Sequence, residues 1–89
     1  MTHANLMQPT ISLDGTSAAD LIQMRIDARE ALQNAREALG RVSPNMRDYI
    51  GNPDGFSRDR EIHVARMMQI GQICDDLMNE AIAIQEAAP

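Results

Sequence analysis

Two long stretches of this chain, residues 17–42 and 57–87, carry apolar residues at the three- and four-residue steps of an α-helix. A segment dense in Gly, Asn, Pro and Asp, residues 51–56, separates them and favours a turn. Neither helix can bury its apolar side alone, so the two are expected to fold back on each other. The pattern therefore predicts an all-α protein built on a hairpin of two long helices.

The remaining segments complete this organisation. Residues 1–15 mix turn-forming residues with isolated apolar ones and are predicted to be a flexible N-terminal tail. Residues 16–89 are predicted to form a single helical domain, because 89 residues supply one hydrophobic core at most. Within that domain, Ser43 and Pro44 are expected to start a short helix over residues 44–50, since Pro favours the first helical position.

Capping residues set the expected starts of the two long helices. Thr16 or Ser17 can accept a backbone N–H at the start of the first helix, and Asp20 then lies in the first turn, where the helix dipole favours a negative charge. Ser57 has the same role for the second helix. These residues predict that the long helices begin at residues 17 and 57.

The predicted packing seam of the first helix is built mainly of alanine. Positions seven residues apart fall on one face of a helix. The seam consists of Leu21, Met24, Ala28, Ala31, Ala35, Ala38 and Val42, with Leu32 and Leu39 beside it. Small residues allow a partner backbone to come close, so the seam is expected to face the second helix. Arg29, Arg36 and Glu37 are expected on the opposite, solvated side.

The second helix is apolar over most of its circumference. Its main stripe consists of His63, Met67, Ile70, Ile73, Cys74, Leu77, Ala81 and Ile84. A second stripe beside it consists of Val64, Met68, Gly71, Met78 and Ile82. The polar ribbon that remains runs through Gln69, Gln72, Asp76, Asn79 and Glu80. A helix with so wide an apolar surface must be covered on more than one side.

One partner helix covers only one of the two stripes, so two hairpins are expected to pair into a dimeric four-helix bundle. The predicted partner or dimer interface joins the second stripe to two residues of the first helix that lie off its seam. It comprises Ile22, Ile26, Val64, Met68, Gly71, Met78 and Ile82. A break of the second helix near Gly71, which would give a compact monomer, is the alternative architecture.

No pattern in the chain specifies a reaction. It has no Gly-rich phosphate loop, and its serines lack the Gly-x-Ser-x-Gly context of a nucleophile. His63, Met67 and Cys74 share a helical face, but Met67 and Cys74 are about 10 Å apart along the axis, too far for one ion. We therefore expect no catalytic residue, no metal and no cofactor.

The charge pattern excludes other partners. The net charge is −5, and eight Arg are dispersed among thirteen acidic residues, whereas a nucleic acid needs a concentrated positive surface.

No window approaches the roughly 18 apolar residues of a membrane span, and the start of the sequence lacks the pattern of a secretory signal. We expect a cytoplasmic protein that binds neither nucleic acid nor membrane. Arginine without lysine is typical of GC-rich bacterial genomes.

These observations favour a small non-catalytic protein-binding module, such as an adaptor, a regulator or a secretion-type chaperone. Its expected partners are its own copy, as a homodimer, and a protein with an amphipathic helix, to which flexible Met side chains adapt well. The alternative is a small helical enzyme or metabolite binder. Its anion site would lie at a dimer interface and would use Arg25, Arg29, His63 and Arg66.

Overall fold

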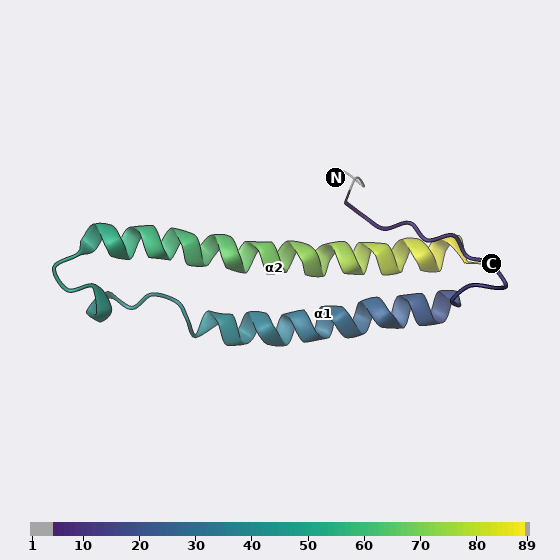
Figure 1. Cartoon of the computed structure of the whole chain (residues 1–89), viewed down its shortest axis with the longest axis horizontal. Coiled ribbons are helices and arrows are strands. Elements are labelled where there is room, and N and C mark those ends of the chain that lie inside the picture. The colour runs from purple at the N-terminus through teal and green to yellow at the C-terminus, as the bar shows by residue number, and fades with distance from the viewer. Residues whose placement is uncertain (1–4, 89) are drawn as a thin grey trace.

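The computed structural model describes residues 5–88 and consists of two antiparallel α-helices joined by a connection with one 3₁₀ helix (Figure 1). Helix α1 spans Ala18–Gly40, the 3₁₀ helix η1 spans Met46–Tyr49, and α2 spans Pro53–Ala87. The described part of the chain contains no strand. The predicted all-α hairpin is confirmed.

Helix α1 begins where its capping signal placed it. Ser17 is extended, and its Oγ accepts a hydrogen bond from the backbone N–H of Asp20 at 3.1 Å. The helix ends at Gly40, two residues before the expected end. The N–H groups of Arg41 and Val42 bond to carbonyls three residues back, which closes the last turn.

Helix α2 begins four residues before the expected start, so Ser57 lies inside it rather than capping it. The Oδ1 atom of Asn52 accepts a hydrogen bond from the N–H of Gly55 at 3.1 Å and caps the helix. Pro53 occupies the first turn, where a missing N–H costs nothing because that group would have no helical partner. Residues with turn chemistry therefore form a helix start here.

The connection between the helices is held by its own backbone bonds. The expected short helix is η1, shorter than residues 44–50 and of the 3₁₀ type, with the side chain of Asn45 accepting from the N–H of Arg47. Gly51 then takes a φ of +75°, a conformation that side chains with a Cβ disfavour. This turn leads the chain directly into α2.

The hairpin is far more elongated than an ordinary domain of its length. Its radius of gyration is 18.3 Å, whereas a compact domain of this size has about 12 Å. Its accessible surface is 6828 Å², which exceeds by roughly 1,600 Å² the area of about 5,200 Å² expected for a folded monomer of this mass. The chain by itself leaves an unusual amount of surface in contact with solvent.

The core is correspondingly thin. Among the described apolar residues, only Cys74, Ala81 and Ile84 are buried, all on the main stripe of α2. The other residues of that stripe are half-buried, with one exception. Ile73 is 47% exposed, because it lies at the edge of the contact with α1 and not at its centre. A core of this size makes each buried side chain important to stability.

The packing seam predicted for α1 is wrong for most of its residues. Its alanines are exposed, and Met24 and Val42 are 59% and 62% exposed, whereas Leu21, Leu32 and Leu39 are half-buried. The side facing α2 also carries three arginines: Arg25 is buried, Arg29 is half-buried, and Arg36 bonds to the backbone of α2. Long arginine stems bury apolar length while their guanidinium groups find hydrogen-bond acceptors, so arginine can occupy a helix contact that alanine cannot fill.

The start of the described chain, with residues 6–9, lies along the C-terminal end of α2, and the chain then passes around that end to α1 (Figure 1). The backbone N–H of Met7 donates a hydrogen bond to Glu80 Oε2 at 3.0 Å, and Leu6 and Pro9 are half-buried beside α2. The flexibility expected of residues 1–15 stays a prediction, and residues 1–4 lie outside the described range. None of the described helices is long and apolar enough to cross a membrane.

Candidate protein-interaction face

The second stripe of α2 lies along one edge of the hairpin. A Cβ added at Gly71 would meet the guanidinium of Arg36 at 3.8 Å, so Gly71 lies at the border between the two helices. Val64 and Met78 are each seven residues from Gly71 and therefore project on nearly the same side of α2. Met68 follows Val64 by about one turn, and Ile82 follows Met78 in the same way. The stripe thus continues along this border.

The two isoleucines of α1 border the same face. Gln33, Gly40 and Met67 line a common hollow, which places the Gln33 edge of α1 beside the Met67 edge of α2. Ile26 lies seven residues before Gln33 and shares its edge, and Ile22 lies one turn before Ile26. The structure therefore brings all seven predicted interface residues to one face of the hairpin, which we call the interaction face.

The interaction face is apolar and largely open. Met68 is 67% exposed, Val64 47%, Ile82 44% and Ile26 40%. The remaining three residues, Ile22, Gly71 and Met78, are half-buried. The exposed Asp75 separates the apolar pair Val64 and Met68 from the pair Met78 and Ile82. Large apolar side chains scattered singly over a surface are ordinary, but apolar groups repeated along one edge are typical of a site that binds another macromolecule. Their assignment as an interface stays a prediction.

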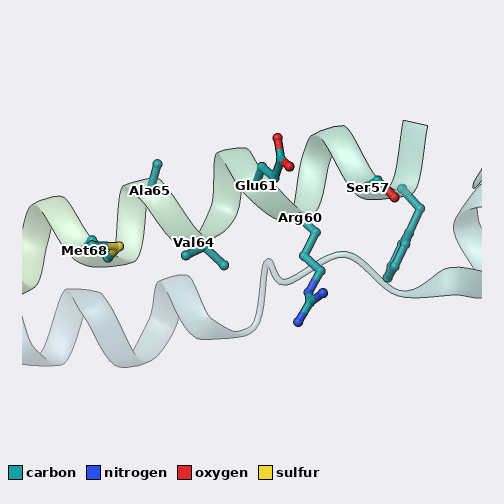
Figure 2. Close-up of a pocket in the computed structure, with 7 residues that line it drawn as sticks. Ser57, Arg60, Glu61, Val64, Ala65 and Met68 are labelled. Carbon is teal, nitrogen blue, oxygen red and sulfur yellow. The ribbon is translucent and has the colours of Figure 1, made fainter. Parts of the chain in front are cut away.

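A shallow hollow marks the start of this face (Figure 2). Phe56, Arg60, Val64 and Met68 line it on α2. In Figure 2, Arg60 and Val64 extend toward the side of the connection, whereas Ala65 points away from it. Apolar side chains with a charged residue beside them are suited to receive the apolar side chain of a partner.

The opposite face also carries exposed apolar side chains, and the N-terminal segment covers one end of it. Val42 and Ile62 line a hollow there with Arg66, so the exposed seam of α1 belongs to this side. Ile73 and Glu80, seven residues apart, continue the same side along α2, and Glu80 binds Met7 of the N-terminal segment. Residues 6–9 of the chain thus occupy one end of the opposite face and leave the interaction face open.

A buried ion pair joins the two helices near that end. Arg25 Nε lies 2.9 Å from Glu80 Oε1, and the two side chains are 10% and 6% exposed. Arg25 Nη1 also donates to the carbonyl of Leu21 at 3.0 Å, while the second oxygen of Glu80 accepts from Met7. Glu80, which the sequence places on the polar ribbon of α2, is buried, and Arg25 and Met7 satisfy its carboxylate inside the contact.

Two further polar contacts line the contact between the helices. Arg36 Nε donates to the carbonyl of Met67 at 3.2 Å, and the Cys74 thiol lies 3.9 Å from the carbonyl of Arg29. Arg29 Nε is buried and has no hydrogen-bond partner among the described residues. The arginines therefore contribute to the packing of the hairpin as well as to its charge.

The structure does not assemble the alternative anion site within one chain. Arg25 is occupied by Glu80, and His63 lies about 26 Å farther along α2 from that carboxylate. Within residues 5–88, no group of three or more His, Cys, Asp or Glu gathers in a way that would hold a metal ion. The thiol of Cys74 is buried in the helix contact.

A hydrogen bond ties the connection to α2. The hydroxyl of Tyr49 donates to Asp59 Oδ2 at 2.7 Å, and the Tyr49 ring meets the Phe56 ring edge to face with centroids 5.7 Å apart. This hydrogen bond lowers the pKa of Asp59 and raises the pKa of Tyr49. The contact fixes the end of the hairpin at the start of α2.

This contact predicts a pH-dependent difference between the wild type and Tyr49→Phe, which keeps the ring pair and loses the hydroxyl. Because the pKa of Asp59 is lower in the folded protein than in the unfolded chain, this group stabilises the fold above about pH 4. That contribution is lost as the pH falls through the pKa that Asp59 has in the folded protein. A raised pKa of Tyr49 stabilises the fold below about pH 10, and that contribution fades above it. Melting curves should therefore differ most at neutral pH. A difference that stays constant from pH 3 to 7 would contradict the Asp59 contribution.

Comparison of the chain with protein-family models, curated proteins and solved structures finds no match. The function must therefore be inferred from the geometry of the described residues. Their most distinctive features are the open interaction face and the large exposed area of the hairpin.

Proposed function

We propose that this protein is a small, non-catalytic protein-binding module of the cytoplasm, acting as an adaptor, a regulator or a secretion-type chaperone. The interaction face is its binding surface, and the exposure of Met68, Val64 and Ile82 on one strip is the observation that carries the proposal. Burying such a strip against apolar side chains is favourable at about 25 cal/mol per Å² of apolar surface.

A second copy of the chain is the first expected partner. The hairpin exposes roughly 1,600 Å² more than a compact monomer of its mass, and a standard interface buries about 800 Å² on each partner. A dimer can therefore cover a large part of the excess. Two helical hairpins that pair through one face give a four-helix bundle, which supplies the thicker core that a single hairpin lacks.

The double substitution Met68→Ala and Met78→Ala tests the binding surface. We expect it to raise the dissociation constant of self-association at least tenfold while the helix content stays unchanged, because apolar area at the contact is lost. Sedimentation at micromolar concentrations and far-UV circular dichroism measure the two quantities. Met24→Ala is the matched control, since Met24 is exposed on the other face.

Two results would count against this proposal. A wild-type chain that sediments as a monomer, with a melting temperature independent of concentration, would remove the homodimer. A double variant that loses its helix content would show that Met68 and Met78 belong to the core of the hairpin and not to a binding surface.

A further inference from the structure

Eight residues along one edge of α2 are spaced symmetrically about residue 73, so the steps between them are the same when read toward either end of the helix. They are Arg60, Val64, Met68, Gly71, Asp75, Met78, Ile82 and Glu86. A two-fold axis across the middle of this series matches each residue with one from the other half. Apolar residues then meet apolar residues, and a basic end meets an acidic end. A surface that matches itself under a two-fold rotation is what a symmetric dimer requires.

We propose that two copies of the chain pair through this edge of α2, antiparallel, with the two-fold axis crossing the helices near residue 73. The proposal rests on the proposed function, in which a second copy is the partner, and adds the orientation and the contacts. Facing helices in such a bundle approach to 8–10 Å. Each contact between unlike residues occurs twice, because the axis repeats it.

The apolar contacts form two layers on each side of the axis. Val64 faces Ile82 of the second copy, and Met68 faces Met78 of the second copy. Three of these side chains are strongly exposed on the single chain, and Met78 is half-buried. The hollow at Val64 and Met68 (Figure 2) lies where Ile82 of the second copy arrives. The pairing therefore buries apolar surface that the hairpin leaves in water.

The centre of the edge adds charge complementarity. Gly71 has no side chain, and the guanidinium of Arg36 lies 3.8 Å from the position that a Cβ would take there. Asp75 of the second copy lies opposite Gly71 and thus beside Arg36. Arg36 donates to the Met67 carbonyl through Nε, and a guanidinium has further N–H groups to donate to a carboxylate. Gly71 makes room for this contact.

The ends of the edge add a second pair of opposite charges. Arg60 and Glu86 are both exposed, and neither has an ion-pair partner within residues 5–88. The two-fold axis places Arg60 of one copy opposite Glu86 of the other. A parallel pairing would instead set Arg60 against Arg60 and Asp75 against Asp75, and like charges facing each other are unfavourable. The charges therefore select the antiparallel orientation.

Charge reversal in mixtures tests this orientation. Arg60→Glu leaves two acidic ends, and Glu86→Arg leaves two basic ends, so each variant alone should dissociate about tenfold more readily at 50 mM salt. Mixed in equal amounts, the two variants should form heterodimers with wild-type affinity, because every end then meets its opposite. Native mass spectrometry distinguishes the heterodimer from the parent chains. Asp27→Arg, an exposed reversal away from this edge, is the control and should leave association unchanged.

A disulfide measures the register independently of charge. Met68→Cys and Met78→Cys should crosslink when the two variants are mixed under oxidising conditions. Neither should crosslink alone, since like positions lie about 15 Å apart along the axis, and a disulfide needs Cα atoms within about 7 Å. Cys74 is buried and stays in place in both variants.

The outcomes separate this inference from the proposed function. A dimeric wild type whose charge-reversed variants do not rescue each other, or whose Met68→Cys variant crosslinks to itself, overturns the antiparallel orientation and leaves the binding module standing. A wild type that stays monomeric at 100 µM overturns the pairing itself. A monomer that binds an amphipathic helical peptide through Met68 overturns the second copy as occupant while supporting the binding face.

Discussion

Replacing Glu80 with Ala is expected to lower the free energy of unfolding by about 3–5 kcal/mol, because it leaves the buried guanidinium of Arg25 without its counter-charge. The same change removes the acceptor of the Met7 N–H. A domain of this size has little stability to spare, so the variant should be largely unfolded near 37 °C. Urea denaturation at fixed protein concentration measures the difference.

The double variant Arg25→Met with Glu80→Leu is the matched control. It removes both charges and fills the site with apolar side chains of similar volume, a change that is often neutral or stabilising for a buried pair. We expect it to recover most of the stability lost in Glu80→Ala. If Glu80→Ala costs under 1 kcal/mol, the carboxylate is solvated in solution and the buried pair is contradicted.

Ile84→Ala is expected to cost about 2–5 kcal/mol, since Ile84 is 4% exposed and its truncation leaves a cavity in a thin core. Ile73→Ala makes the same chemical change on the same helix. Ile73 is 47% exposed, so its truncation should cost below about 1 kcal/mol. Thermal or urea denaturation of both variants, at one protein concentration, measures the contrast.

Ile73 and Ile84 lie eleven residues, or about three turns, apart and project from nearly the same side of α2. Ile84 lies beside Leu6, Met7 and Pro9 of the N-terminal segment, so equal losses for the two isoleucines would contradict the cover that this segment gives to Ile84. The pair of variants therefore tests whether the N-terminal segment packs on the C-terminal end of α2.

The helices themselves follow from local chemistry and were predictable. Periodic apolar residues mark both long helices, and Ser17 caps the first at the position that its side chain specifies. The main stripe of α2 faces the core with the exception of Ile73, because seven-residue repeats hold a side chain on one face over several turns. The start of α2 at Pro53 was harder to predict, because Asn, Pro and Gly are common both in turns and at helix starts.

Hydrophobicity predicted the partner side of α1 only in part, through Leu32 and Leu39, which are half-buried. Arg25, Arg29 and Arg36 face α2 while the alanines face solvent, the reverse of the usual ranking of buried residues. The reason is a tertiary one. Arg25 is buried because Glu80 meets it from the other helix, and Arg36 finds the Met67 carbonyl. Such pairings depend on how two helices are aligned, which neither helix encodes alone.

The residues of the interaction face could be predicted from the sequence only in part. The spacing of Val64, Met68 and Met78 singled out a second stripe on α2, and the alignment of the hairpin places Ile22 and Ile26 beside it. The charges at Arg60 and Glu86 carry no periodic signal of their own. Their role becomes visible only when a second, antiparallel copy of the α2 edge is placed opposite the first, because Arg60 then faces Glu86.

The hydrogen bond between Met7 and Glu80 spans 73 positions of an 89-residue chain, nearly its entire length. During synthesis the ribosome releases the first turns of the hairpin long before the last turns of α2 exist. Arg25 and Met7 therefore stay hydrated until Glu80 has been translated, and contacts of such high sequence separation form late in folding. The nascent chain cannot close this end of the hairpin until Glu80 has left the exit tunnel.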